Sequence, residues 1–303
     1  MPEFSKGMTV FAPAKVNLHL AVKDRRQDGF HDIESVFLAV DFGDSLRFSL
    51  QKKIPHKQDY NDNLTNIIIK GIDLSLPIDE NIVSKAVSLF REKTGFSENL
   101  EIILKKRIPP GGGLGGGSSD AASALLVLNK IAGFPCSRDD LLLMAAALGS
   151  DVPFFIYETS AAMVTGRGER IEPVNVPQAY IMLVNPGFPS NTAAAFRLLD
   201  EYREQENTAK NPNQDVLRSP LIAPYSKFLN DFLPVFNEPE KSIYRGIISQ
   251  LEAEGAEFAS LSGSGSTCFG IFPNEKTACK AFGQIKNRWK FVKLSKTFIR
   301  NNL

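Results

Sequence analysis

Residues 109–120 read PPGGGLGGGSSD and connect a predicted strand, residues 100–104, to a predicted helix, residues 121–131. The six glycines of this run allow successive backbone N–H groups to converge on one point, because no Cβ atom blocks the approach or the left-handed dihedral angles. The following helix adds the positive end of its dipole, and Ser118 and Ser119 add hydroxyl groups. A plain turn would not need so many glycines, so the segment predicts a phosphate-binding loop.

Two known kinds of phosphate loop fit this segment poorly. Residues 112–117 have the spacing of a Walker loop, but Ser118 stands where that loop has a lysine, which disfavours a Walker ATPase. Residues 111–116 satisfy the dinucleotide-binding pattern, which is weak by itself. A Rossmann domain normally begins with this strand and helix, whereas about a hundred residues precede the loop here. An NAD-dependent dehydrogenase is therefore a less favoured alternative, and a nucleotide-binding module without catalysis is another.

A protein kinase is excluded by the order of its motifs. Asp41-Phe42-Gly43 spells DFG, but it precedes the glycine run instead of following it, and no catalytic-loop triplet is present. We interpret these three residues as a turn at the end of a strand.

A second loop of small residues lies near the C-terminus. Residues 260–267, SLSGSGST, separate two apolar segments, residues 258–261 and 268–272. Small residues suit a backbone nest for an anion, although a plain hairpin turn would have a similar composition. The presence of the first loop favours the nest. Two such loops could surround one polyphosphate from opposite domains.

The rest of the chain has the mixed pattern of an α+β protein in two domains. Two polar stretches, residues 51–66 and 205–220, predict surface loops. We expect residues 1–160 to form an N-terminal domain with the glycine-rich loop and residues 161–303 to form a C-terminal domain. Apolar periodicity predicts strands at residues 16–22, 45–50, 100–104, 154–157, 180–184, 258–261, 268–272 and 291–298, and helices at residues 82–93, 121–131, 139–148, 193–204, 243–254 and 275–287.

The composition excludes several classes of protein. Lys and Arg (35) nearly balance Asp and Glu (34), whereas a nucleic-acid-binding protein usually has a basic excess. No apolar run is long enough to cross a membrane, and the first ten residues lack the pattern of a signal peptide. Cys136, Cys268 and Cys279 are scattered, so we expect reduced core thiols in a cytoplasmic protein. The histidines show no zinc-ligand spacing with them, so no metal cage is expected.

Three segments, in this order, resemble the three motifs of the GHMP small-molecule kinases, a superfamily that includes homoserine, mevalonate and galactose kinases. They are FAPAKVNL (residues 11–18), PPGGGLGGGSSDAA (109–122) and SLSGSGSTCFGIF (260–272). The resemblance covers most of the chain. It implies an α+β two-domain GHMP kinase fold, with an N-terminal domain like ribosomal S5 domain 2 and a C-terminal ferredoxin-like α/β layer. It also implies ATP as phosphoryl donor, with Mg²⁺.

Four shorter features give a closer resemblance within the superfamily. PAKVNL (residues 13–18), DGFH (28–31), LGSDVP (148–153) and NPG (185–187) are similar to the members that phosphorylate the 2-hydroxyl of a methylerythritol carrying a cytidine diphosphate group, in the non-mevalonate isoprenoid pathway. Phe30 departs from the tyrosine that these members commonly have. A homoserine or mevalonate type of kinase stays as the alternative. We expect a monomer or homodimer with no nucleic-acid or membrane partner.

The resemblance also implies the roles of individual residues. Asp151 would be the general base and Lys15 would contact it and the acceptor hydroxyl; we expect Asp151 to follow a helix ending at Gly149 and to precede extended backbone. The cytosine would lie between Phe30 and Phe196, with His31 contacting its polar edge. No residue is assigned to a metal. The residues implied for ATP are Pro109, Pro110, Gly111, Gly112, Gly113, Leu114, Gly115, Gly116, Gly117, Ser118, Ser119, Gly263, Ser264 and Gly265, and those implied for the acceptor are Asn17, Phe30, His31, Thr192 and Phe196.

Overall fold

The computed structural model describes residues 7–51, 65–72, 77–205 and 225–299, and the chain divides into two compact units. Unit 1 comprises Met1–Pro13, Gly43–Ile108 and Gly116–Tyr157, and unit 2 comprises Ala14–Phe42, Pro109–Gly115 and Glu158–Leu303. The last change of unit, between Tyr157 and Glu158, lies close to the predicted boundary at residue 160. The two earlier segments of unit 2 were not predicted, because a single boundary in the sequence cannot describe a chain that passes between units several times.

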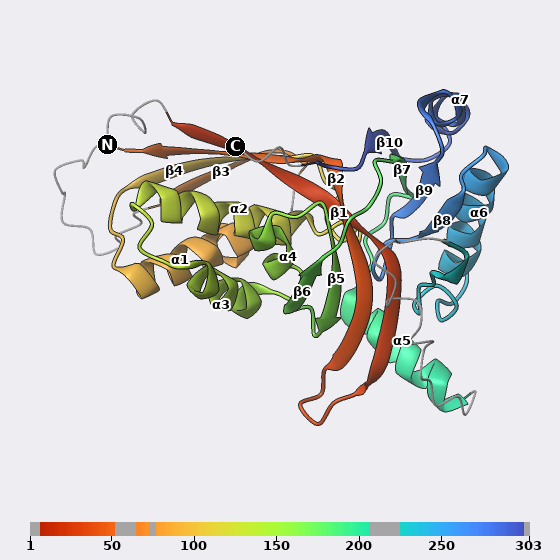
Figure 1. The fold of residues 1–303 in the computed structure, drawn as a ribbon, viewed down its shortest axis with the longest axis horizontal. Helices are drawn as coiled ribbons and strands as arrows, with labels where there is room; N and C mark the ends of the chain where they lie inside the picture. Colours follow the sequence, from red (N-terminus) through yellow and green to blue (C-terminus); the bar gives the residue numbers. More distant parts are fainter. Residues whose placement is uncertain (1–6, 52–64, 73–76, 206–224, 300–303) are drawn as a thin grey trace. The chain divides into compact units, whose positions relative to one another are not determined.

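Unit 1 combines part of a sheet with four helices, which Figure 1 shows lying side by side. The long strands β1 (Met8–Arg25) and β2 (His31–Leu50) run through both units. In unit 1, β2 pairs antiparallel with β4 (Leu100–Lys106), and β3 (Thr65–Gly71) pairs parallel with β4. The helices are α1 (Ile82–Thr94), α2 (Gly116–Ile131), α3 (Arg138–Leu148) and α4 (Val152–Tyr157), and a short 3₁₀ helix, η2 (Ile78–Glu80), precedes α1.

The helices of unit 1 begin and end at residues that satisfy free backbone groups. The Asn81 side chain accepts a hydrogen bond from the Val83 N–H at 2.9 Å and caps α1, which ends at the left-handed Gly95. Ser137 and Asp140 form a capping box at the start of α3. Most of α2 is buried, and the helix begins at Gly116 instead of the predicted Ala121. The end of the glycine run is therefore the first turn of this helix.

Several predictions for unit 1 were wrong. Residues 154–157 form α4 instead of a strand, because a short apolar run that is buried on all sides has no diagnostic period. Asp151 therefore precedes a helix, since Val152 and Pro153 form its first turn instead of extended backbone. The polar stretch 51–66 ends in strand β3, which begins at Thr65; residues 52–64, and residues 206–220 of the second polar stretch, lie outside the described residues.

The DFG tripeptide does not form a turn, since it lies within β2. A Cβ atom on Gly43 would come within 2.1 Å of the Ala12 carbonyl oxygen on the neighbouring β1. Gly43 therefore allows the two strands to approach each other closely. The sequence does not show this, because the same residues are also typical of a turn.

Unit 2 contains a four-stranded antiparallel sheet with the order β10-β7-β9-β8. Helices α6 and α7 pack on this sheet (Figure 1), and one helix precedes β8 while the other follows β9. This order and these crossings are those of a ferredoxin-like layer, as predicted. The elements are β7 (Tyr180–Asn185), α5 (Thr192–Gln205), a short 3₁₀ helix η4 (Tyr225–Lys227), α6 (Glu240–Ala253), β8 (Phe258–Leu261), β9 (Cys268–Phe272), α7 (Glu275–Ile285) and β10 (Phe291–Lys296).

Two strands of unit 2, β5 (Ala161–Gly166) and β6 (Arg170–Pro173), were not predicted from the sequence. β5 pairs with β2 from Ile33 to Leu38, and β6 pairs with β5. Both unpredicted strands are short, so their periodicity is weak.

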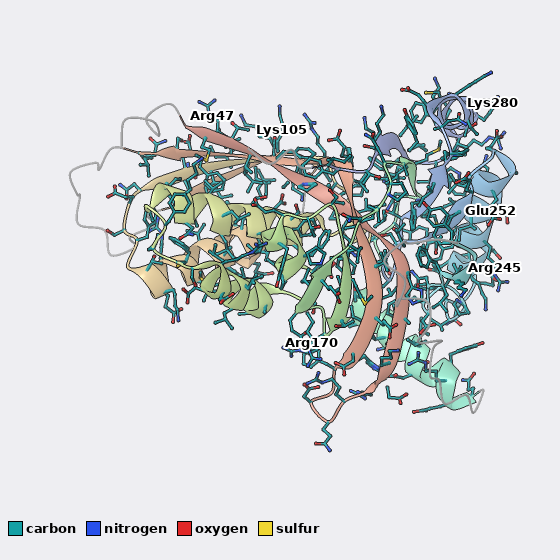
Figure 2. The ribbon with its side chains drawn as sticks, viewed as in Figure 1. Arg47, Lys105, Arg170, Arg245, Glu252 and Lys280 are labelled. Carbon is teal, nitrogen blue, oxygen red and sulfur yellow. The ribbon has the colours of Figure 1, made fainter. Side chains whose placement is uncertain are left out.

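The outer faces of α6 and α7 are polar, and Arg245, Glu252 and Lys280 are exposed on them (Figure 2). Cys279 is also exposed on α7, next to the buried Ala278, so the prediction of three core thiols is wrong for Cys279 and confirmed for Cys136 and Cys268. Among the described residues, no helix is long and apolar enough to cross a membrane.

Candidate active site

The Pro109–Gly115 part of the glycine run belongs to unit 2 and is held there by its carbonyl groups. Four consecutive carbonyl oxygens accept hydrogen bonds from other segments of the same unit. The pairs are Ser190 N–H to Gly111 O (2.8 Å), Thr267 N–H to Gly112 O (3.1 Å), Ser262 Oγ to Gly113 O (2.8 Å) and Lys15 N–H to Leu114 O (2.9 Å). The peptide planes of the loop are therefore fixed from one side.

The N–H groups of this loop are left for another partner. Within the described part of the chain, no acceptor is paired with the backbone N–H groups of residues 113–115. Gly113 has φ +73°, and a Cβ atom there would come within 2.0 Å of the Ser262 carbonyl oxygen. Only glycine fits this position. Unpaired N–H groups beside left-handed glycines form a concave donor surface for an anion.

The second loop is the turn of the β8–β9 hairpin, and it lies against the first loop within unit 2. Its turn is closed by hydrogen bonds from Ser262 N–H to Thr267 O (2.9 Å) and from Gly265 N–H to Ser262 O (3.0 Å). A Cβ atom on Gly263 would lie 3.5 Å from Gly113 O. The two loops are thus neighbours, and the expectation that they come from opposite domains is wrong for residues 109–115.

Two residues that sequence reasoning did not assign to the site, Asn185 and Ser190, contact the second loop through their side chains. Asn185 Nδ2 donates to Ser266 Oγ (3.1 Å) and Thr267 Oγ1 (2.9 Å), and Ser190 Oγ donates to Ser264 O (2.6 Å). Asn185 belongs to the NPG segment, which was noted only as a family feature. Thr192, which was predicted for the acceptor, has its Oγ1 3.0 Å from Ser264 Oγ.

Lys15 and Asn17 lie buried on β1, beside both loops. Lys15 Nζ donates to Asn17 Oδ1 at 2.7 Å and lies 4.6 Å from the centroid of the Phe37 ring. Asn17 Nδ2 donates to Ser35 Oγ at 3.0 Å. Asn17 Oδ1 also lies 3.4 Å from the position of a Cβ atom on Gly263. A positive charge is thus held in a fixed position next to the loops, as electrostatic stabilisation of an alkoxide requires.

The remaining part of the glycine run and Asp151 belong to unit 1. Gly116 to Ser119 form the first turn of α2, where the N–H groups of a helix lack intrahelical partners. Among the described residues, the buried Ser119 Oγ has no hydrogen-bond partner. Asp151 is half-buried between α3 and α4. The contact of Lys15 with Asp151 that the resemblance implies stays a prediction.

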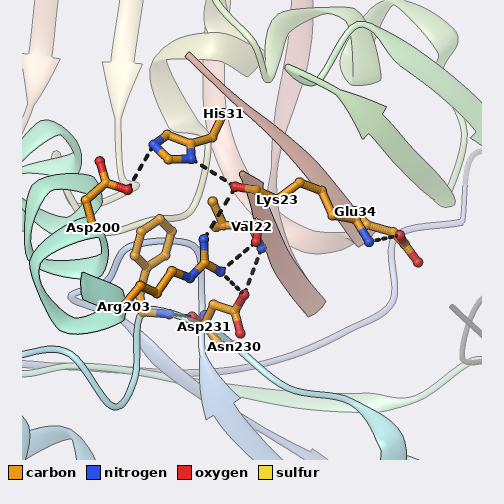
Figure 3. Close-up of polar contacts among 9 residues, drawn as sticks. Val22, Lys23, His31, Glu34, Asp200, Arg203, Asn230 and Asp231 are labelled. Carbon is orange, nitrogen blue, oxygen red and sulfur yellow. Dashed lines mark hydrogen bonds and ion pairs between the residues drawn. The ribbon is translucent and has the colours of Figure 1, made fainter. Parts of the chain in front are cut away.

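The predicted acceptor residues His31 and Phe196 lie together in unit 2. Their rings are stacked, with centroids 5.3 Å apart and planes at 20°, and Phe196 also meets Phe232 edge-on at 4.9 Å. His31 Nδ1 lies 2.9 Å from Lys23 O, and Nε2 lies 3.3 Å from Asp200 Oδ1 (Figure 3). Both ring nitrogens therefore face oxygen acceptors.

A second group of polar contacts connects β1 to α5, the helix that contains Phe196 and Asp200. Arg203 donates to Val22 O (2.6 Å) and Asp231 Oδ2 (3.0 Å), and Asp231 Oδ2 also accepts from Val22 N–H (2.9 Å; Figure 3). Sequence reasoning missed Asp200 and Arg203. The helical spacing of Phe196, Asp200 and Arg203 along α5 was a signal that could have indicated them.

Phe30, the other predicted ring of the cytosine site, lies apart from this cluster. Its side chain is 56% exposed, and the Arg167 guanidinium lies 5.0 Å from its ring centroid. Among the described residues, Phe30 and Phe196 make no ring contact with each other. The Phe30 and Phe196 rings therefore do not face each other as the two sides of a cytosine site.

His19 lies buried on β1, two residues beyond the predicted acceptor residue Asn17. Burial lowers the pKa of its imidazole, and the carboxylates of Glu34 and Asp231 oppose this effect only in part. Its Nδ1 accepts a hydrogen bond from Leu229 N–H at 3.2 Å, which requires a ring nitrogen without a proton. His19 is thus a neutral structural residue.

Comparison with known proteins gives two family matches and a consistent set of relatives. The model of the GHMP kinases N terminal domain matches residues 81–159, and that of the GHMP kinases C terminal domain matches residues 230–290. The 4-diphosphocytidyl-2-C-methyl-D-erythritol kinase of Thermodesulfovibrio yellowstonii is 35% identical, over 93% of this chain and 95% of its own length. The enzyme of the same name from Prochlorococcus marinus is 33% identical, over 92% and 91%.

Solved structures agree with these relatives. A crystal structure of 4-(cytidine 5′-diphospho)-2C-methyl-D-erythritol kinase superimposes with a TM-score of 0.75 and 28% identity, covering 95% of this chain and 98% of the other. A homoserine kinase from Cytophaga hutchinsonii gives a TM-score of 0.67 with 18% identity, covering 97% and 95%. At that identity the likeness concerns the fold alone.

Proposed function

Since the chain belongs to the 4-diphosphocytidyl-2-C-methyl-D-erythritol kinases of the GHMP kinase superfamily, we propose that it transfers a phosphoryl group from ATP to the 2-hydroxyl of 4-diphosphocytidyl-2-C-methyl-D-erythritol. The observation that carries the proposal is 35% identity over 93% of the chain to a relative of that name. The chain is a small-molecule kinase, and its fold is the GHMP kinase fold. The homoserine and mevalonate kinases share only the fold with it, so that alternative is not favoured.

The ATP phosphates would be bound by the backbone of the two glycine loops and the first turn of α2. Three observations among the described residues fit this: the unpaired N–H groups of residues 113–115, the lack of room for a side chain at Gly113, and the buried Ser119 Oγ without a partner. The residues proposed for ATP are Pro109, Pro110, Gly111, Gly112, Gly113, Leu114, Gly115, Gly116, Gly117, Ser118, Ser119, Gly263, Ser264 and Gly265.

Mg²⁺ is proposed as a companion of ATP and not as a resident of a protein cage. Within the described ranges, no group of three or more His, Cys, Asp or Glu side chains could hold a metal ion. Magnesium commonly keeps several waters and binds largely through substrate phosphates, where it neutralises their charge. We assign no protein ligand to it.

Asp151 and Lys15 are proposed to act on the acceptor hydroxyl. The Asp151 carboxylate would take the proton of the 2-hydroxyl, and the Lys15 ammonium would stabilise the oxygen as it becomes negative. The fixed position of Lys15 Nζ on Asn17 Oδ1 supports its part of this proposal. The proposed role of Asp151 as the base rests on its position in the LGSDVP segment (residues 148–153), which resembles that of the family.

The cytidine diphosphate group of the acceptor would be bound in unit 2. Asn17, Phe30, His31, Thr192 and Phe196 are the proposed residues. The stacked His31 and Phe196 rings on neighbouring elements support a flat aromatic ligand there. The cytoplasmic location, the monomeric or homodimeric state and the domain limits 1–160 and 161–303 also remain our predictions.

A coupled assay of ADP release tests the function. We expect turnover with 4-diphosphocytidyl-2-C-methyl-D-erythritol and none with homoserine or mevalonate at the same concentration. Equal or higher turnover with either of the latter would overturn the substrate assignment.

Asp151→Asn tests the proposed base. The variant keeps the shape of the side chain but removes the proton acceptor, so we expect kcat to fall about 10²- to 10⁴-fold. The dissociation constant of ATP, measured by calorimetry without the acceptor, should stay close to that of the wild type. Near-normal kcat at saturating acceptor would show that another group accepts the proton.

A further inference from the structure

Two adjacent lysines on β4 have opposite environments. Lys105 is exposed (Figure 2), whereas the side chain of Lys106 is 4% exposed, because neighbouring residues of a strand point to opposite faces. A buried ammonium group is costly unless it is paired with carboxylates or other acceptors. Lys106 has such partners, and none of them belongs to the residues proposed above for ATP or acceptor.

The partners of Lys106 are two buried aspartates of unit 1. Its Nζ donates to Asp44 Oδ2, on β2, and to Asp120 Oδ2, on α2, at 2.8 Å. Asp44 is completely buried and Asp120 is 2% exposed. One positive charge thus connects two carboxylates from different elements, and we call Asp44, Lys106 and Asp120 the buried clip.

The clip contacts the chain on both sides of the glycine loop. Asp44 Oδ1 accepts hydrogen bonds from Arg107 N–H (2.5 Å) and Ile108 N–H (2.9 Å), the last residues of unit 1 before the loop. Asp120 follows the first turn of α2 directly after the loop. A Cβ atom on Gly116 would meet Ile108 Cγ2 at 2.9 Å, so the two flanking segments also touch each other.

We propose that Asp44, Lys106 and Asp120 are positioning residues for ATP, which hold the two flanks of the glycine loop so that the first turn of α2 presents its N–H groups to the phosphates. The proposal rests on the assignment of this turn to ATP. It goes further because it gives a function to three buried charges that do not belong to the proposed site.

The charge of the clip supports a link to anion binding. Burial raises the pKa of Asp120 to about 7, against the opposing effect of Lys106. Burial lowers the pKa of Lys106, but Asp120 and Asp44 outweigh this and raise it above its usual value. The Lys106 ammonium therefore stays charged near neutral pH, and the clip carries about one negative charge less when Asp120 is protonated. Among the described residues, Asp120 Oδ1 and its neighbour Ser119 Oγ lack hydrogen-bond partners.

Electrostatics determines the direction in which the affinity for ATP should change with pH. A phosphate bound at the first turn of α2 repels an ionised Asp120, the residue that follows this turn. Bound ATP therefore favours the protonated carboxyl. As the pH rises through about 7, wild-type protein should lose ATP affinity relative to a variant with an uncharged residue at position 120.

The first experiment compares Lys106→Met with Lys105→Met by calorimetric titration of MgATP without acceptor. Lys106→Met leaves two buried carboxylates without their cation, and small displacements in a phosphate site can cost about a hundredfold. We expect the ATP dissociation constant to rise about ten- to a hundredfold in Lys106→Met and to stay unchanged in Lys105→Met. If folded Lys106→Met binds ATP as tightly as Lys105→Met, the proposal is overturned.

The second experiment decides the matter if Lys106→Met does not fold. Asp120→Asn keeps the size and the contact to Lys106, and Asp139→Asn, on the exposed start of α3, is its control. The ratio of wild-type to Asp120→Asn dissociation constants should rise between about pH 6 and pH 8, whereas the ratio for Asp139→Asn should stay constant. A purely structural role would change the melting temperature and leave the first ratio constant, and this would overturn the proposal.

Failure of the proposed function would be distinguishable from failure of the clip. If the wild-type protein does not bind ATP, the function itself is wrong. If the wild type binds ATP and the variants bind it equally well at every pH, only the positioning role is wrong.

Discussion

Residues 109–115 of the first glycine loop, the second glycine loop and the aromatic acceptor region all lie in unit 2, but the loops and the acceptor region use different parts of the residues. The loops use backbone groups: the carbonyls of residues 111–114 are anchored, and Gly113 has no room for a side chain. The acceptor region uses side chains: His31 and Phe196 are stacked, and Phe30 is 56% exposed. Backbone N–H groups can bind the phosphates of ATP whatever the acceptor is. The side chains of the acceptor region, in contrast, can differ between enzymes and so select one acceptor.

This difference predicts how the two regions respond to substitution. A backbone site depends on conformation, so one wrong residue disturbs all its donors together. A side-chain site is a set of separate contacts, so each substitution should remove one contribution and leave the remainder. The loops should therefore fail abruptly and affect ATP, while the acceptor region should weaken by steps and affect only the acceptor.

The largest effect is expected for Gly113→Ala. The new Cβ atom would come within 2.0 Å of Ser262 O, and φ is +73°, so the loop must move. We expect the ATP dissociation constant, measured by calorimetry, to rise about a hundredfold or more.

Gly95→Ala is the matched control for this variant. Gly95 has a similar φ of +71° at the end of α1, but a Cβ atom there would meet nothing within 4 Å. It should cost about 1 kcal/mol of stability and leave ATP binding unchanged. If both variants bound ATP equally well, the close contact of the two loops would have no part in phosphate binding.

The two regions also differ in how far the sequence predicted them. The loops were predicted because glycine has few uses that need six copies at a strand-to-helix junction. The hairpin strands around Gly263 were predicted with correct limits, since both are apolar and end at small residues. Their contact with each other was not predicted, because it depends on the passage of Pro109–Gly115 into unit 2.

The acceptor region was accessible only through family resemblance. Phe30, His31 and Phe196 are three aromatic residues among many, and no local pattern distinguishes them from core residues. Asp200 was missed because its importance comes from a contact with His31, far away in the sequence. Asp151 was found, but the helix after it was not, since VPFFIY has no period that separates a buried helix from a buried strand.

A smaller effect is expected for Phe30→Ala and Phe196→Ala. Stacking on a base is worth about 1–3 kcal/mol, so each variant should raise the acceptor KM about ten- to a hundredfold and leave the KM for ATP unchanged. Cytidine diphosphate should compete with the acceptor in the wild type.

Thermal unfolding separates the two variants. Phe196 contacts His31 and Phe232, so Phe196→Ala should lower the melting temperature, whereas the exposed Phe30 should tolerate alanine without loss. An unchanged acceptor KM in both variants, or no competition by cytidine diphosphate, would remove the cytosine site from these rings and leave the kinase assignment intact.

The smallest effect is expected for Asp200→Asn, which changes the partner of the His31 ring and not the ring itself. His31 Nδ1 faces Lys23 O, and Nε2 faces Asp200 Oδ1 at 3.3 Å, so both contacts fix the orientation of the ring. Asparagine would keep the size of the side chain but present an uncharged amide to Nε2, which should weaken that contact. Because Asp200 is partly exposed, we expect the acceptor KM to rise only about two- to fivefold, with kcat and the KM for ATP unchanged. Glu201→Gln, on the exposed neighbouring position, should change none of the three constants. If Asp200→Asn and Glu201→Gln gave the same acceptor KM, the contact of Asp200 with His31 would only help to hold α5 in place. Asp200 would then have no part in binding the acceptor, and His31 would act without it.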